Sequence, residues 1–142
     1  MNTQLIRNLG LALLGAASIL TVATIHAQGS QALHVNVPFG FHVGASTLPS
    51  GEYTVDTDVA PGAVRLRSAD SKSTVIIQSN AVESLRTSSQ GKLVFHRYGD
   101  EYFLYQIWKS GANTGRELRK SRREIEVAAT MRRGTEPIMA RK

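Results

Sequence analysis

KLVFHRYGDEYFLYQIW, residues 92–108, is the stretch that decides the fold, and it contains six of the nine aromatic residues of the chain. Two apolar, β-favouring runs flank Gly99-Asp100, and glycine as the first loop residue is typical of a two-residue type II′ hairpin turn. A two-residue loop predicts the cross-strand pairs Phe95–Leu104, Leu93–Gln106, Arg97–Tyr102, Val94–Tyr105, His96–Phe103 and Lys92–Ile107. Both faces of this hairpin are largely apolar, so we expect it to be covered on two sides.

The rest of the chain before the hairpin predicts further short strands. Apolar residues alternate with other residues from Leu33 to Val43, and Pro38 and Gly40 interrupt this run, which favours two strands separated by a bend. The segment LPSGEYTVD, residues 48–56, is typical of a turn that leads into a strand. Additional strands are expected over residues 63–68, 74–78 and 80–85, with connections at 44–47 and 110–115.

After the hairpin the sequence predicts one helix. Ser121 and Glu124 have the spacing of a capping box, and an apolar stripe follows them, which indicates a helix from about residue 122 to 131. The predicted fold is therefore mainly β, a small antiparallel β-barrel or β-sandwich of six or seven strands with one C-terminal helix.

Residues 1–27 are typical of a secretory signal sequence. Arg7 supplies a positive start, residues 9–25 form an uncharged apolar segment, and Ala27 is the expected cleavage edge. The alternative is a retained membrane anchor, although the segment is shorter than the ~20 residues of a comfortable span. We expect export to the periplasm or the extracellular space, with a β-barrel or β-sandwich domain over 28–108 and a basic loop, short helix and tail over 109–142.

Several chemical functions lack their residues in this sequence. The chain has no cysteine, which excludes disulfides, thiolate nucleophiles and cysteine-based metal sites. No nucleophile-elbow or phosphate-binding glycine motif is present. His34 and His42 lie about 26 Å apart in an extended strand at about 3.3 Å per residue, too far to share a metal. We therefore predict a non-enzymatic protein with no catalytic residues, metal or cofactor.

The charge is concentrated after the hairpin. Residues 28–108 carry a net charge of −1, whereas residues 109–142 carry +6. An exported basic segment suits anionic lipid, lipopolysaccharide or acidic polysaccharide better than nucleic acid, and a protein partner stays open. The alternative is a solvated helix face with local ion pairs. The candidate residues for an anionic surface are Arg116, Arg119, Lys120, Arg122, Arg123, Arg132 and Arg133.

The aromatic residues of the hairpin give a second hypothesis. Tyr102, Tyr105 and Trp108 are candidates for an aromatic-lined groove that carries a small apolar or carbohydrate ligand, and the alternative is that they form core. Inhibition of cell-wall hydrolases is a third hypothesis and an enzyme a fourth. The first hypothesis is a non-enzymatic envelope-associated or secreted protein that binds an anionic envelope component through its basic segment.

Three motifs together carry a resemblance to a known family. LPSGEYTV at 48–55, GKLVFHRYGDEYFLYQIW at 91–108 and TGRELRKSRREIEVA at 114–128 resemble a family of small secreted proteins of unknown function from soil bacteria of the acidobacterial kind. The resemblance implies a signal peptide and a compact β-rich domain with a basic end. It implies no catalytic residues.

Overall fold

The computed structural model describes residues 32–131 and 138–141. The predicted signal sequence, residues 1–27, and the candidate residues Arg132 and Arg133 lie outside the described residues. Within them the chain is mainly β, with ten strands and one helix, α2 (Arg122–Thr130). The strands are β1 (Leu33–Val37), β2 (Phe41–Val43), β3 (Ser46–Leu48), β4 (Gly51–Ala60), β5 (Ala63–Ser68), β6 (Thr74–Glu83), β7 (Lys92–Tyr98), β8 (Glu101–Trp108), β9 (Thr114–Leu118) and β10 (Ile138–Arg141).

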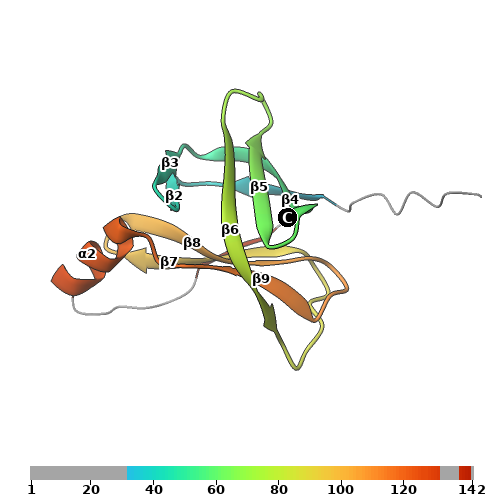
Figure 1. Cartoon of the computed structure of the whole chain (residues 1–142). Helices are drawn as coiled ribbons and strands as arrows, with labels where there is room; N and C mark the ends of the chain where they lie inside the picture. Colours follow the sequence, from blue (N-terminus) through green and yellow to red (C-terminus); the bar gives the residue numbers. More distant parts are fainter. Residues whose placement is uncertain (1–31, 132–137, 142) are drawn as a thin grey trace, which may run out of the picture.

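The strands form two layers that share β6 (Figure 1). The first layer has the order β1-β4-β5-β6, and the second has the order β6-β9-β8-β7-β10. The β2–β3 hairpin joins β8 through one parallel pair, His42–Phe103, which makes the sheet mixed. The strand path ends at β1 and β3 without closing, so the fold is sandwich-like, and the barrel alternative is wrong.

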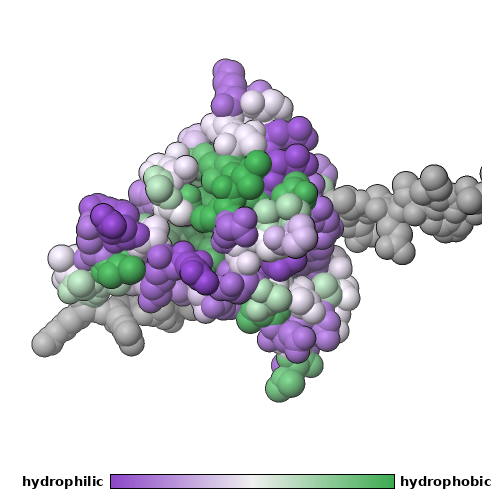
Figure 2. All heavy atoms as spheres, viewed as in Figure 1, coloured by the Kyte–Doolittle hydropathy of each residue, from purple (hydrophilic) through white to green (hydrophobic). Residues whose placement is uncertain are grey.

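The core lies between the two layers, and the sequence alternation decides which side chains enter it. In β4 the alternate residues Tyr53, Val55 and Thr57 are all buried, so this face of the strand points into the core. The other main-core residues are Leu33, Val35, Val37, Phe41, Val43, Leu48, Val64, Leu66, Leu93, Phe95, Leu104, Ile107 and Leu118. Figure 2 shows an apolar patch on this face of the molecule, over the region of β6. In β6, Ile76 is 65% exposed, whereas Val75 and Ile77 are half-buried and pack against the main core.

The hairpin has the predicted turn but only part of the predicted register. Gly99 has a φ of 60°, as the first loop residue of a type II′ turn requires. The pairs Phe95–Leu104, His96–Phe103 and Arg97–Tyr102 are confirmed. Beyond them the prediction is wrong, because a β-bulge at Tyr105 inserts one residue into β8. The observed pairs there are Val94–Gln106, Leu93–Ile107 and Lys92–Trp108.

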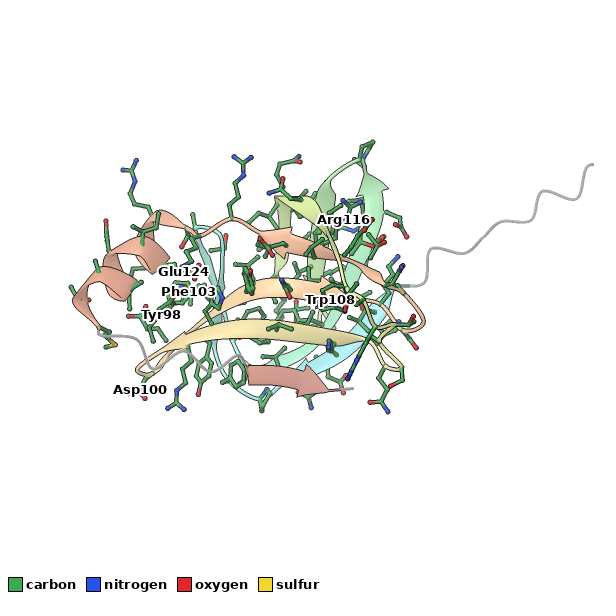
Figure 3. All side chains as sticks on the ribbon, turned by 90° about the horizontal axis from the view of Figure 1, so that it is seen from below. Tyr98, Asp100, Phe103, Trp108, Arg116 and Glu124 are labelled. Carbon is green, nitrogen blue, oxygen red and sulfur yellow. The ribbon has the colours of Figure 1, made fainter. Side chains whose placement is uncertain are left out.

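Cover on both sides of the hairpin is confirmed near the turn, whereas the far half of the outer face lines a surface cleft. One face contributes Leu93, Phe95, Leu104 and Ile107 to the main core. On the other face Tyr98 and Phe103 form a second cluster with Val127 of α2. Figure 3 shows Tyr98, Phe103 and Glu124 together at the helix, with Trp108 near the opposite end of the hairpin.

The described structure has ten strands where six or seven were expected, and the differences lie at β3, β6, β9 and β10. β3 occupies part of the expected connection at 44–47, and β6 is one ten-residue strand where two short strands were expected. β9 lies within the expected basic loop and pairs with both β6 and β8. The β region therefore continues past Trp108, and the division expected there from the charge distribution does not coincide with a break in the sheet.

Candidate functional site

The outer face of the β7–β8 hairpin, turned away from the main core, carries the candidate site. From the turn to the other end, its cross-strand pairs are Tyr98–Glu101, His96–Phe103, Val94–Gln106 and Lys92–Trp108. Helix α2 covers the pairs nearest the turn. The two pairs farthest from the turn line a surface cleft, whose other wall is formed by residues 84–89.

This cleft, which we name the Trp108 cleft, has a volume of about 500 Å³, within the range of small-molecule sites. Its charged lining residues are Arg86 and Lys92, and no acidic side chain lines it. Neither cation forms an ion pair within residues 32–131. The lining residues are Ser84, Arg86, Thr87, Ser88, Ser89, Lys92, Val94, Gln106 and Trp108.

The bulge at Tyr105 assembles the floor of the cleft. Without it, Lys92 would lie opposite Ile107 and Val94 opposite Tyr105. With it, Lys92 pairs with Trp108 and Val94 with Gln106, and all four residues line the cleft. Bulges commonly redirect side chains near binding sites in this way.

The indole and amide of the floor are held in place by the sheet. The indole N–H of Trp108 donates to Oε1 of Gln106 at 3.2 Å, and Nε2 of Gln106 donates to Glu117 at 2.8 Å. The indole ring also lies against Gly115, where an added Cβ would meet ring atoms at 2.7 Å. Gln106 also forms a hydrogen bond with the Tyr105 side chain, so its amide hydrogens have protein partners, whereas its oxygen keeps a second lone pair for a ligand.

The loop that forms the other wall is fastened to the connection between β8 and β9. The Ser84 amide donates to the Asn113 carbonyl at 2.8 Å, and the Ser88 amide donates to Ala112 at 3.2 Å. The Gly111 amide returns a bond to the Ser88 carbonyl at 2.8 Å. A wall held by backbone hydrogen bonds is preorganised, which lowers the entropy that ligand binding must overcome.

At the turn end, α2 is attached through a buried carboxylate. Ser121 caps the helix by accepting the Glu124 amide at 3.1 Å, so this half of the predicted capping box is confirmed. The Glu124 side chain, 4% exposed, points to the sheet. Its Oε1 lies 2.7 Å from Nδ1 of His96 and accepts the Tyr98 hydroxyl at 3.3 Å. The carboxylate therefore joins the helix to β7.

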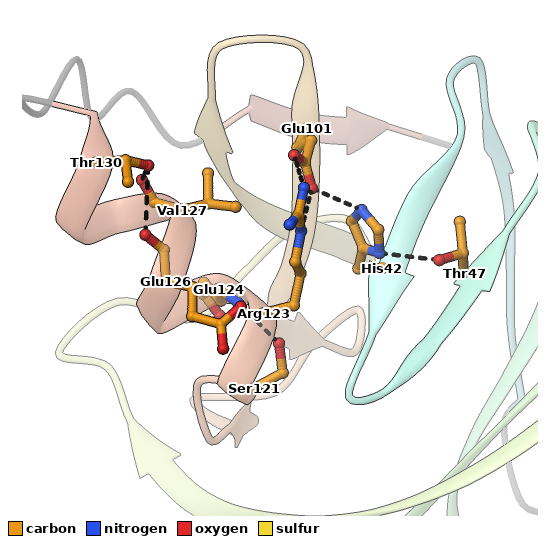
Figure 4. Close-up of polar contacts among 9 residues, drawn as sticks. All are labelled: His42, Thr47, Glu101, Ser121, Arg123, Glu124, Glu126, Val127 and Thr130. Carbon is orange, nitrogen blue, oxygen red and sulfur yellow. Dashed lines mark hydrogen bonds and ion pairs between the residues drawn. The ribbon is translucent and has the colours of Figure 1, made fainter.

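A second polar contact holds α2 against β8 and the β2–β3 hairpin (Figure 4). Arg123 donates two hydrogen bonds to Glu101, at 2.7 and 3.2 Å, and Nε2 of His42 lies 3.2 Å from the same carboxylate. The hydrogen bonds from Arg123, together with its charge and the contact with His42, lower the pKa of Glu101. The Glu101 carboxylate correspondingly raises the pKa of Arg123.

Tyr105 lies between the helix and the cleft. Its ring stacks on His96 with the centroids 4.0 Å apart. Burial raises the pKa of Tyr105, and its hydrogen bond with Glu117 raises it further. Glu117 also accepts a hydrogen bond from Gln106. Hydrogen bonds and one stacked ring pair therefore connect the helix to the floor of the cleft.

No protein-family model, curated protein or solved structure matches this chain. No helix in the described ranges has the length and apolar character of a membrane span. No group of three or more histidine, aspartate or glutamate side chains converges as metal ligands in the same ranges. Function is therefore inferred from the geometry of the site.

Within residues 32–131, the predicted basic residues are divided between different surroundings. Arg116 is half-buried in β9 beside a smaller cavity that Asp58 also lines, and Arg123 is engaged by Glu101. Three of the set are exposed around the start of α2: Arg119, Lys120 and Arg122. Arg132 and Arg133 lie outside the described residues, so the predicted anionic-surface site as a whole stays a prediction.

The predicted aromatic residues are also divided. Tyr102 stacks on Phe39 with the centroids 3.9 Å apart and packs against the main core. Tyr105 lies on the outer face, and Trp108 alone of the three lines the Trp108 cleft. A single groove built from all three is not present in the described structure.

Sequence reasoning missed Arg86 and Lys92. Residues 87–91 have the composition of a polar connection, and the unbulged register places Lys92 away from Trp108. A neighbouring cavity of about 440 Å³ contains Lys109, but that cation is paired with Asp58. The Trp108 cleft is therefore the stronger candidate for binding an anion.

Proposed function

We propose that this protein is a non-enzymatic exported protein that binds an anionic component of the cell envelope in the Trp108 cleft. The observation that carries the proposal is that two cations, Arg86 and Lys92, line the same cleft, and that no acidic residue lines it. Two cations that line one cleft repel each other, and an anion bound in that cleft relieves this repulsion while forming charge-assisted hydrogen bonds.

The chemistry of the lining favours binding over catalysis. It contains hydroxyls, an amide and two cations, but neither a histidine nor a carboxylate to act as a general base. The hydroxyls of Ser84 and Ser88 are engaged in the loop itself, where Ser84 accepts the Arg86 amide and Ser88 donates to Gln90.

We base export and an envelope location on two features of the sequence. One is the apolar segment before Ala27, which is typical of a signal sequence, and the other is the resemblance to a family of secreted proteins. The exposed Arg119, Lys120 and Arg122 would add a long-range attraction that steers the protein toward anionic surfaces.

The test is co-sedimentation of the purified protein with isolated envelope fractions across a salt series. Binding should weaken as salt rises, because exposed charge contacts are screened. The double variant R86Q/K92Q should lose most of the binding, whereas R67Q/K72Q, with the same change in charge in the first layer, should bind as the parent does.

Two results would contradict the proposal. One is no binding at low salt, and the other is an equal loss in R67Q/K72Q. A third double variant, R119Q/K120Q, tests the location of the binding site. A complete loss of envelope binding in this variant would place the site at the start of α2 and not in the Trp108 cleft.

A further inference from the structure

We infer that the ligand of the Trp108 cleft is an acidic saccharide, a sugar ring that carries a carboxylate, as a residue of a polysaccharide chain. The inference rests on the proposed function and specifies the ligand class of the same site. It follows from three parts of the cleft: its cations, its floor and its free hydroxyls.

The two cations suit a carboxylate. Arg86 presents a planar guanidinium whose parallel N–H groups match the two oxygens of a carboxylate, whereas Lys92 adds a compact charge. Arg86 belongs to the loop wall and Lys92 to the sheet, so they approach the cleft from different sides. A carboxylate bound between these two sides of the cleft would be attracted by both charges.

The floor suits the body of a sugar ring. Its two apolar side chains, Val94 and Trp108, are 9% and 7% exposed, so they offer a small apolar surface between polar neighbours. A sugar ring has C–H faces that pack on such a surface and hydroxyl edges that require hydrogen bonds. Gln106 lies beside Trp108 with a lone pair of its amide oxygen still available to accept a hydrogen bond from a ring hydroxyl.

The loop wall supplies more partners for hydroxyl groups. Thr87 and Ser89 line the cleft, and their hydroxyls form no hydrogen bond within residues 32–131. A hydroxyl both donates and accepts, as sugar hydroxyls require. The backbone bonds that fasten this loop to residues 110–113 keep the wall in place without a ligand.

The same lining argues against a lipid as the ligand. A lipid chain needs a continuous apolar groove, whereas Val94 and Trp108 are the apolar members of a lining that is otherwise polar. A lipid headgroup would use the two cations but leave the floor and the Thr87 and Ser89 hydroxyls unused. The acidic saccharide uses all three parts.

Trp108 provides a direct readout, because it is the single tryptophan of the chain. The probe is tetragalacturonate, titrated against the purified protein while Trp108 fluorescence and heat are recorded. Its fully methyl-esterified form, which keeps the rings but lacks the charge, and phosphatidylglycerol vesicles are titrated in parallel. Tetragalacturonate should change the fluorescence and bind at least about tenfold more tightly than the ester, because the ester loses the charge-assisted bonds.

Variants connect the binding to the cleft. R86Q and K92Q should each weaken tetragalacturonate binding about tenfold, while R67Q should leave it unchanged. Circular dichroism checks that the variants keep the fold. Equal binding of the ester, or an unchanged Trp108 signal on binding, would overturn the inference.

The vesicle titration separates the two proposals. Vesicle binding that requires Arg86 and Lys92, without tetragalacturonate binding, would keep the proposed function and overturn the saccharide assignment. No binding of tetragalacturonate, vesicles or envelope material would overturn both. Tetragalacturonate binding that R86Q and K92Q weaken supports both.

Discussion

The two ends of the β7–β8 outer face differ in whether their charged side chains have partners within the protein. At the turn end, Glu101, Arg123 and Glu124 lie between helix and sheet, and each has a charged or polar partner. At the other end, Arg86 and Lys92 line a cleft without an ion pair in the described chain. One hairpin thus supports a closed, structural end and an open end suited to a ligand.

The difference follows from burial. A carboxylate as enclosed as Glu124 must be hydrogen-bonded, since an unpartnered buried charge is strongly destabilising. Arg86 is exposed and keeps its hydration, so it needs no partner for stability. Substitutions at the closed end should therefore affect unfolding, and those at the open end should affect binding.

The largest effect is expected from F103A. Phe103 is 2% exposed, with His42 stacked on its ring and Tyr98 and Val127 packed around it. Removing the ring should lower the free energy of unfolding by about 3–5 kcal/mol, through lost burial and the cavity left behind. Urea unfolding followed by circular dichroism measures the change. The control is I76A at an exposed apolar position. If F103A lowered the free energy of unfolding by no more than I76A does, Phe103 would not be a main contact between helix and sheet.

E124A should have the next largest effect. It leaves His96 and Tyr98 without their shared acceptor and should cost about 2 kcal/mol of unfolding free energy. E124Q keeps an acceptor oxygen and should cost less. E126A, an exposed position on the same helix, is the matched control. Equal stability of E124A and E126A would show that the buried carboxylate does not hold the helix.

Acidification should weaken the closed end by a smaller amount. The pKa of Glu101 is lowered in the folded protein, mainly by the hydrogen bonds from Arg123, so Glu101 favours the folded state above its unfolded pKa. This contribution is lost as the pH falls through the lowered folded pKa. Unfolding free energies measured from about pH 7 to about pH 3 should fall less for E101Q than for the parent protein. Identical pH profiles would contradict the assignment.

The smallest effect on stability is expected at the open end. R86Q/K92Q should change the unfolding free energy by less than about 0.5 kcal/mol, because neither cation has a partner to lose. Urea unfolding followed by circular dichroism tests this, with R67Q/K72Q as the control. A large loss of stability would show that the two cations support the fold, and the contrast between the two ends would fail.

Local sequence rules predicted the turn of the hairpin and the strand pairs next to it. Gly99-Asp100 specifies the turn, and the turn specifies the register up to Leu104. The bulge at Tyr105 depends on packing on both faces of the sheet, and nothing in the local pattern indicates it. Because a shift of one residue changes which side chains share a face, the error extends to Lys92 and Trp108.

The sequence did not predict β9, also because the strand depends on contacts with distant residues. Thr114–Leu118 has Leu118 as its one large apolar residue, and Gly115 is typical of a loop. In the fold, glycine is required there because the Trp108 ring lies against its backbone. The helix, by contrast, has its start signal in the local sequence at Ser121 and was predicted within one residue of its observed bounds.

The shared strand β6 also determines the order in which the molecule can assemble. Its first half, Thr74 to Gln78, pairs with β5 across a short turn, but Ser79 to Glu83 must wait for β9. During synthesis or export, an intermediate with a completed first layer would therefore present an unsatisfied backbone edge from Ser79 to Glu83. Such edges are templates for pairing between chains, so this half-strand is where we expect aggregation to begin and a chaperone to bind.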